Sequence, residues 1–348
     1  MDDIETSDQP PHPRVGLAYN LKHTTESGLP DDEAEYDDIS TVVAIERALE
    51  YSGCQVELME ATDELPDRLR RSRPDIVFNI AEGRRGRARE AQVPSMCNFY
   101  GIPFTGSDET TLCVALDKAL TKRLLATHRI RTPKYKVARA ATRETFSGVP
   151  FPVIVKPNAE GSSKGIGNFS VAENRGELNR ILTKNMGLYR QDMLVEEYVD
   201  GREFTVGILG NGPGARVFPP MEIVYRNRNR FSIYSFEVKK DYQAQIRYEC
   251  PADIDADTQS EIMDMARGIY TVLECRDFAR IDFRLSRAGR PYFIEINPLP
   301  GLAPGYSDFP MLAGFCGMDY DTLVCSVLDA ALKRYGLPFS LKAGDGHE

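Results

Sequence analysis

The chain has 348 residues, 42% of them hydrophobic and 27% charged, so it can bury one large core or a few smaller ones and is too apolar for disorder. It carries 43 basic and 52 acidic residues, and the net charge of -9 has the wrong sign for a protein that mainly binds nucleic acid. No run approaches the roughly 18 apolar residues of a membrane helix, and the acidic N-terminus does not resemble a signal peptide. We therefore expect a soluble, cytoplasmic protein with no nucleic-acid or membrane partner.

Seven cysteines are scattered along the chain without a CxxC pair. The odd number and the spacing argue against both a disulfide framework and a structural zinc site. We expect reduced, mostly buried thiols.

The first part of the chain alternates strand and helix patterns. Short apolar runs predict strands at 15–19, 55–59 and 75–80, and helical periodicity predicts helices at 39–51 and 65–71. This alternation is typical of a parallel sheet with helices on its faces.

The pattern changes after a strong helix predicted at 117–128. In the next part we expect an antiparallel or mixed sheet, with strands near 137 and at 151–156, 166–171 and 194–198 and a helix at 177–184. In the last part we expect strands at 203–209, 221–225, 278–285 and 291–296 and helices at 257–273 and 319–335.

A lysine followed by a glycine-rich loop is the first chemical motif. The stretch 151–157 (FPVIVKP) places Lys156 in a strand, and the loop 160–167 (EGSSKGIG) follows. Such a loop brings backbone N–H groups close to phosphate oxygens, and the lysine adds a positive charge. The lysine precedes the glycines, so this is not a Walker motif. The alternative interpretation is a hairpin loop with a surface lysine.

Four polar residues on two predicted neighbouring strands form the second motif. The period of two puts Arg280 and Asp282 on one face of their strand, and Glu295 and Asn297 on one face of the next. Ligands that are all oxygen atoms suit Mg²⁺ bound together with substrate phosphates. The alternative is a salt-bridged sheet face in which Arg280 pairs with Asp282.

These motifs resemble the ATP-grasp superfamily and, within it, the D-alanine:D-alanine ligase family. The resemblance covers about residues 15–335. Its most specific stretches are 100–107 (YGIPFTGS), 116–118 (LDK), the Lys156 loop, 195–203 (VEEYVDGRE) and 295–301 (EINPLPG).

The resemblance implies an α/β (α+β) ATP-grasp fold in three units. The first would be an N-terminal Rossmann-like parallel-sheet domain at 14–115. A central ATP-grasp subdomain at 116–200, with a lid loop at 161–165, and a C-terminal subdomain at 201–340, with the magnesium site, would clamp ATP between them. The lid would keep water from a reactive acyl phosphate.

The resemblance also implies roles for individual residues. Lys118, Lys156 and Lys239 would contact the phosphates, residues 196–199 would line the adenine pocket, and Glu203 would accept the ribose hydroxyls. The full set implied to bind ATP is Lys118, Lys156, Ser163, Glu196, Glu197, Tyr198, Val199, Glu203, Lys239 and Ile294. The resemblance implies that Asp282, Glu295 and Asn297 bind two Mg²⁺, with Mn²⁺ as an alternative. It implies catalytic roles for Arg280, Ser162 and Lys239.

The implied reaction joins a carboxylate to an amine. The carboxylate attacks the γ-phosphate of ATP to give an acyl phosphate, the amine displaces phosphate, and ADP and an amide remain. Positioning and charge neutralisation are the main needs of phosphoryl transfer, which explains the lysines, the arginine and the magnesium. The implied partners are small amino-acid substrates and, because the family is often dimeric, a second copy of the chain.

The sequence departs from the family on the amino-acid side. Glu82 replaces the histidine of a His-Gly pair, and arginines at 84, 85, 87 and 89 replace nearby acids, which indicates either a pocket for a differently charged substrate or a solvated basic loop. Lys240 stands where the family has an aromatic residue. The remaining candidates for the substrate pocket are Glu35 or Asp37 (with Asp38 as a further option) for an ammonium group, Gly301, and either Tyr306 or Ser307 for the family's serine.

These departures leave alternatives open. One hypothesis is an ion-paired latch of Lys240, Ser162 and an acid between Glu35 and Asp38. The enzyme could ligate other amino acids in a tailoring or secondary-metabolite pathway. It could also be a kinase on the same scaffold or, with no turnover, an ATP sensor.

Overall fold

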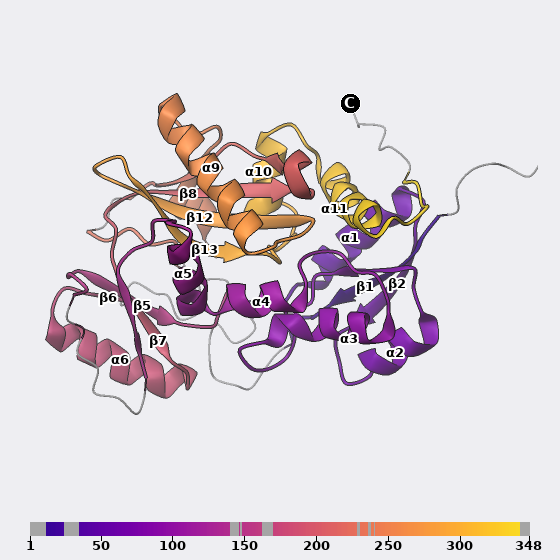
Figure 1. Ribbon diagram of the computed structural model, residues 1–348, viewed down its shortest axis with the longest axis horizontal. Coiled ribbons are helices and arrows are strands. Elements are labelled where there is room, and N and C mark those ends of the chain that lie inside the picture. The colour runs from indigo at the N-terminus through magenta and orange to yellow at the C-terminus, as the bar shows by residue number, and fades with distance from the viewer. Residues whose placement is uncertain are drawn as a thin grey trace, which may run out of the picture.

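The computed structural model describes residues 12–23, 35–139, 146, 148–161, 170–227, 230–235, 238–239 and 241–341. In these residues the chain forms three sheets. The three-stranded and four-stranded sheets lie at opposite ends of the molecule, and the six-stranded sheet lies above the region between them (Figure 1).

The N-terminal sheet is parallel, as the alternating pattern predicts, and its strand order is β2-β1-β3. Its strands are β1 (Arg14–Tyr19), β2 (Gln55–Glu60) and β3 (Ile76–Asn79). The helices of this part are α1 (Ile39–Tyr51), α2 (Leu65–Ser72), η1 (Arg89–Ala91), α3 (Gln92–Tyr100) and α4 (Glu109–Leu116).

The second sheet is antiparallel, with the order β4-β7-β5-β6. It consists of β4 (Tyr135–Ala138), β5 (Val153–Pro157), β6 (Val171–Ala172) and β7 (Met193–Glu197). Two helices belong to this part, α5 (Lys118–Thr127) and α6 (Arg175–Tyr189). Asp117 caps α5 by accepting a hydrogen bond from the Leu120 backbone. The cap fixes the start of the helix and so the position of Lys118, its first residue.

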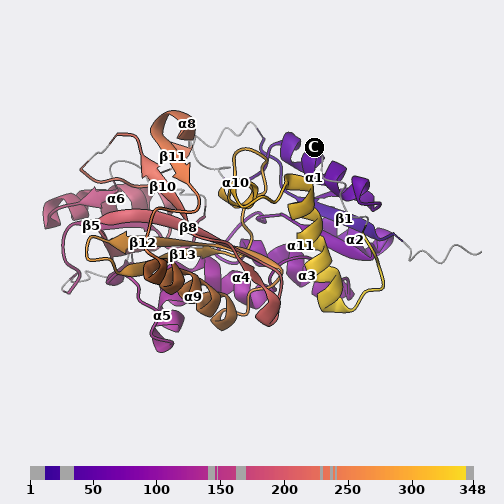
Figure 2. The ribbon, with the colours of Figure 1, turned by 90° about the horizontal axis from the view of Figure 1, so that it is seen from above.

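The third sheet is also antiparallel, with the order β11-β10-β8-β12-β13 and β9 paired to β8. Its strands are β8 (Gly201–Leu209), β9 (Arg216–Val217), β10 (Met221–Tyr225), β11 (Ile246–Glu249), β12 (Phe278–Ser286) and β13 (Pro291–Asn297). The helical segments are η2 (Gly212–Gly214), α8 (Tyr242–Gln245), α9 (Ala256–Val272), α10 (Asp308–Phe315) and α11 (Tyr320–Tyr335). Figure 2 shows α9 along one face of this sheet and α10 and α11 on the side of the N-terminal part.

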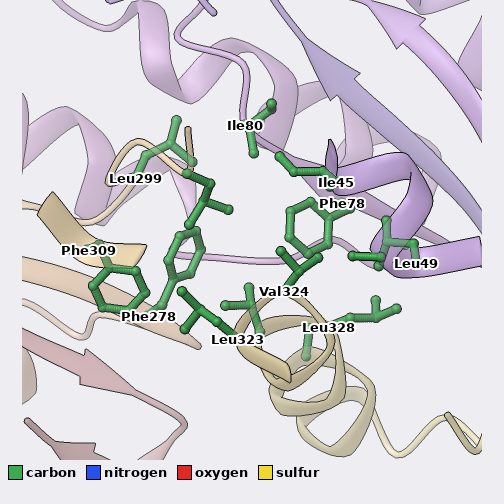
Figure 3. Close-up of a cluster of buried hydrophobic side chains, with 14 of the residues drawn as sticks. Ile45, Leu49, Phe78, Ile80, Phe278, Leu299, Phe309, Leu323, Val324 and Leu328 are labelled. Carbon is green, nitrogen blue, oxygen red and sulfur yellow. The ribbon is translucent and has the colours of Figure 1, made fainter. Parts of the chain in front are cut away.

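A hydrophobic core joins the two ends of the sequence. Helix α11 packs against α1, and the same cluster contains side chains from the first and third sheets. Figure 3 shows Ile45 and Leu49 of α1 facing Val324 and Leu328 of α11, with Phe78 among them. The C-terminal helix therefore holds the first and third sheets in a fixed relation.

The predicted fold class is confirmed, and so are most elements. Helix α1 has the predicted bounds, and α11 begins one residue late because Asp319 caps it. Helix α6 is longer than predicted: Asn174 caps its start, and it continues through Gly187, a weak helix former. The prediction missed α3, α4, α10 and β11, which are short and lack strong periodicity. Most of the strand predicted at 166–171 lies outside the described residues.

No single described helix is long and apolar enough to cross a membrane, and only α10 and α11 taken together, bent by 108°, pass that test.

Candidate active site

One cavity, of about 70 Å³, lies between the second and third sheets. Strands β5 and β7 line one side, and β8, β10, β12 and β13 line the other. Of the ten residues predicted to bind ATP, eight line it: Lys156, Glu196, Glu197, Tyr198, Val199, Glu203, Lys239 and Ile294.

A buried carboxylate with two lysines anchors the side of this cavity formed by β7. The Glu196 oxygens lie 3.0 Å from Lys122 Nζ and 2.9 Å from Lys156 Nζ. Burial favours a raised pKa of Glu196, but the two ammonium groups outweigh burial and keep its pKa below the usual range. Burial lowers the pKa of Lys122 to about 8. The pairing fixes Lys156 at the cavity wall.

Glu203 presents a second buried carboxylate to the same cavity. The Tyr225 hydroxyl donates to its Oε2 at 2.6 Å, and Arg284 Nη1 lies 3.5 Å from that atom. Burial raises the pKa of Glu203, and Arg284 opposes that shift only in part. A carboxylate of this kind is a strong acceptor for ligand hydroxyl groups.

The three predicted metal ligands come together on neighbouring strands. Asp282 on β12 pairs with Glu295 on β13, and Asn297 Nδ2 lies 3.4 Å from Asp282 Oδ2. Two carboxylates and an amide oxygen on one sheet face are the ligand chemistry that Mg²⁺ prefers, so the residues fit this ion. They contain only two acids, and no group of three His, Cys, Asp or Glu forms a metal cluster among the described residues.

Positive charges surround Glu295. Burial raises its pKa, but Lys118, Lys156, Lys239 and Arg280 outweigh burial and lower the pKa to about 2. Lys118 Nζ lies 3.4 Å from the carboxylate. Four cations from the second and third parts of the chain therefore surround one carboxylate, where a polyanion would be stabilised.

A second cavity, of about 110 Å³, adjoins the first and shares Lys239 and Glu295 with it. The third sheet and the loop after β13 line one side, and the N-terminal part lines the other. Six predicted substrate residues are in its lining: Glu35, Asp37, Glu82, Gly301, Tyr306 and Ser307.

The loop after β13 is held against the start of α10. Ser307 Oγ accepts a hydrogen bond from the Ala303 backbone at 3.1 Å, and a Cβ on Gly301 would lie 2.8 Å from that Oγ. Glycine at 301 therefore lets the two segments approach. Both Tyr306 and Ser307 reach the cavity, so the alternatives for the family's serine stay open.

Arg89 differs from the other arginines of its loop because it is buried. Its Nη2 lies 2.6 Å and 2.7 Å from the two oxygens of Glu35, and Nη1 donates to the Ala159 carbonyl at 3.0 Å. It also lies 3.2 Å from Glu160. Arginines 84, 85 and 87 are exposed, but they line a further cavity of about 690 Å³ together with Arg89, so both interpretations of these arginines stay open.

Arg280 lies between two carboxylates. It donates to Asp282 at 3.0 Å and 2.9 Å, and its Nη1 lies 3.3 Å from Asp308 Oδ2. Tyr234 and Tyr248 donate to the other oxygen of Asp308 at 2.8 Å and 3.0 Å. The guanidinium is thereby oriented at the junction of the two cavities.

Some predicted site residues lie outside the described residues, and some residues at the site were not predicted. Ser162, Ser163 and Lys240 are outside the described residues, and with them most of the predicted lid and latch. Three residues that line or support the cavities were not predicted from the sequence: Lys122, Glu90 and Asp308. Lys122 lies one helical turn after Lys118, and that spacing is the signal that could have identified it.

The three-sheet architecture and the cavity between the second and third sheets are those of an ATP-grasp fold. A family model described as "D-ala D-ala ligase C-terminus" matches residues 125–329. The chain belongs to the D-alanine–D-alanine ligase family of ATP-grasp ligases.

Individual proteins are similar to this chain in sequence or in fold. The chain is 34% identical to the uncharacterized protein y4sG of Sinorhizobium fredii over 78% of each chain. It is also 34% identical to the D-alanine–D-alanine ligase of Cupriavidus metallidurans, over 74% of this chain and 76% of the relative. The structure of D-alanine–D-alanine ligase from Bacillus anthracis complexed with ATP matches the fold with a TM-score of 0.73, at 20% identity over 93% of this chain and 99% of that one.

Proposed function

We propose that the protein is an ATP-dependent carboxylate–amine ligase that joins two amino acids through an acyl phosphate and releases ADP and phosphate. One observation carries the proposal: the two cavities meet at Lys239 and Glu295, and four cations surround that junction. A phosphoryl group held there faces both the nucleotide and the amino acid.

The nucleotide occupies the cavity between the second and third sheets. Residues 196–199 line the base, Glu203 accepts the ribose hydroxyls, and Lys118, Lys156 and Lys239 neutralise the phosphates. The buried pairs described above support these roles, because they hold the lysine and carboxylate groups in place before the ligand arrives.

Mg²⁺ would be held by Asp282, Glu295 and Asn297 and would neutralise phosphate charge during transfer. The donor set supports this role. Asp282 now pairs with Arg280, so metal binding would free part of the guanidinium for the substrate.

The reaction proceeds in two steps at the junction. The carboxylate oxygen of the first substrate attacks the γ-phosphorus, and the bond to the ADP oxygen breaks. The amine of the second substrate then attacks the acyl carbon, phosphate leaves with one oxygen of the former carboxylate, and the amine loses a proton. Arg280 and Lys239 stabilise the negative charge that develops in both steps.

More than one pair of amino acids is a candidate for the two substrates. D-alanine is one candidate, because relatives at about one-third identity are named D-alanine–D-alanine ligase. Glu82 and the buried Arg89–Glu35 pair line or border the substrate cavity and support a different amino acid. The homodimer stays a prediction, which sedimentation analysis tests.

The test is phosphate release from ATP and Mg²⁺ with D- and L-amino acids, singly and in pairs, with mass spectrometry of the products. We expect an amide product, and phosphate that depends on both substrates. The Asp282→Asn variant should lose at least about 100-fold in turnover, the scale seen when an electrostatic stabiliser of a transition state is removed. A phosphorylated end product would indicate a kinase, and the absence of turnover with every pair would contradict the proposal.

A further inference from the structure

The wall that the N-terminal part contributes to the substrate cavity is strongly acidic. Five carboxyl groups line it, from Glu35, Asp37, Asp38, Glu82 and Glu90, and the only cation from this part in the described lining is Lys22. Lys22 pairs with Asp38 at 3.2 Å, and Arg89 pairs with Glu35 at 2.6 Å. The other three carboxyl groups of the wall, those of Asp37, Glu82 and Glu90, outnumber the cations that this part still offers in the described lining.

Glu90 is the most unusual group of this wall. It lies in η1, its residue is only 8% exposed, and it lines the cavity. Across the described residues, no hydrogen bond or ion pair reaches its carboxyl group, nor that of the partly buried Glu82. An unpaired buried carboxylate is costly, so a group of this kind at a cavity wall indicates that a ligand supplies its partner.

The charges around Glu90 do not replace that partner. Facing it are Arg89 and Glu82 of the same segment, Glu35 before α1, Lys118 of α5 and Glu160 after β5, and Cys113 of α4 is also near. Burial outweighs the attraction of Arg89 and raises the pKa of Glu90 to about 7. Burial also raises the pKa of Glu82, and the charge of Glu90 adds to that shift.

The two cations near Glu90 are already engaged. Arg89 bonds Glu35, the Ala159 carbonyl and Glu160, and Lys118 pairs with Glu295. The described residues offer no further cation to Glu82 and Glu90, so an ammonium group of the substrate can serve as their partner.

We propose that the acid substrate is a diamino acid, and that Glu82 and Glu90 hold its side-chain ammonium group. The proposal rests on the proposed function and deepens it. An amino acid with a neutral side chain brings one ammonium group to this wall, whereas a diamino acid brings two. The remaining acid of the wall, Asp37, lies near the α-amino group in this arrangement.

Calorimetry with matched ligand pairs tests the proposal. The protein is loaded with Mg²⁺ and a non-hydrolysable ATP analogue. Each diamino acid is compared with its isosteric neutral partner: 2,3-diaminopropionate with 2-aminobutyrate, 2,4-diaminobutyrate with norvaline, and ornithine with norleucine, in D and L forms. We expect at least one diamino acid to bind about 10- to 100-fold more tightly than its partner, as a charge-assisted hydrogen bond allows.

The Glu90→Gln variant gives a second readout. It should abolish the preference for the diamino acid, whereas Glu50→Gln, on the exposed end of α1, should leave the preference unchanged. Binding of the diamino acid near pH 7 should also release protons, measured from the heats in two buffers, because the ligand's ammonium group favours the ionised carboxylate. The release should fall in Glu90→Gln.

Equal or tighter binding of every neutral partner, or an unchanged preference in Glu90→Gln, overturns the proposal. So does the absence of binding by all the diamino acids. These outcomes differ from a failure of the proposed function. Amide formation from neutral amino acids without any diamino preference would refute only this inference, and diamino-acid binding without amide formation would refute only the ligase.

Discussion

The burial of the Glu90 carboxyl group predicts an effect on protein stability that can be measured without substrate. Its pKa in the folded protein is raised to about 7 from an ordinary value of 4.5, so ionisation costs folding free energy as the pH rises through this range. Glu90→Gln removes that cost. We expect the variant to be more stable than the wild type by on the order of 2 kcal/mol at pH 8.

The pH dependence of this gain identifies its origin. The gain should shrink as the pH falls toward 5, where the folded protein keeps Glu90 protonated. Thermal denaturation of the wild type, Glu90→Gln and the exposed control Glu50→Gln at pH 5, 6.5 and 8 measures it. A gain independent of pH, or an equal gain in the control, would show that Glu90 is not a buried, unpaired acid.

Replacing Lys122 should have the opposite effect and lower the stability of the protein. Its ammonium group is fully buried and bonds Glu196, the Thr132 hydroxyl and the Ile294 carbonyl. Lys122→Met leaves Glu196 with Lys156 alone, and breaking a buried pair costs about 3 to 5 kcal/mol. The matched control is Lys333→Met, whose exposed pair with Asp329 is worth about 0.5 kcal/mol. Similar unfolding midpoints for the two variants would contradict the role of Lys122.

Some residues of the site can be predicted from the sequence and others cannot. The period of two predicts that Arg280 and Asp282 share a face of their strand and that Glu295 and Asn297 share a face of the next. The register that sets the two pairs opposite each other comes from the structure. Glu90 and Asp308 could not be predicted, because their importance comes from burial, and burial here depends on contacts between segments far apart in the chain.

At the scale of elements, the contact between α1 and α11 carries much of the packing between the two ends of the sequence. Leu328 of α11 is fully buried in this cluster (Figure 3). Leu328→Ala should cost about 2 to 5 kcal/mol, the usual range for a buried leucine. Chemical denaturation measures the loss, and the surface variant Asp329→Ala should cost less than about 1 kcal/mol. A loss no larger than that of the control would contradict this packing.

Elements with strong periodicity were predictable, and short ones were not. Helices α1 and α11 have apolar positions at helical spacing and clear end signals, so their bounds follow from the sequence. Helix α10 is eight residues long, contains Pro310, and is apolar on most sides because it is buried. Its pattern has no polar face to define a period, and tertiary packing decides its conformation.

At the scale of the whole molecule, function depends on how three sheets meet. The second and third sheets form the cavity proposed for the nucleotide, and the first and third form the cavity proposed for the amino-acid substrate. Lys239 and Glu295 belong to both. The packing of α11 on α1 therefore has a chemical consequence, because it sets the acidic N-terminal wall against the residues proposed to hold the phosphates.

The sequence could indicate this arrangement only through the resemblance to a known family. Composition and periodicity predict a parallel sheet, then an antiparallel or mixed sheet and a third set of strands, but they contain no information on which faces meet. The positions of the two cavities and the shared residues come from the structure, and the lid and Lys240 remain predictions.

In the proposed reaction, ATP activates a substrate carboxylate at the junction of the two cavities. The most direct measurement supplies the acid substrate with oxygen-18 in its carboxyl group and analyses the released phosphate by mass spectrometry. An acyl phosphate requires one carboxylate oxygen to leave with the phosphate, so each turnover should transfer one labelled oxygen. Amide formation with unlabelled phosphate, or label retained wholly in the acid while ATP is consumed, would contradict the account.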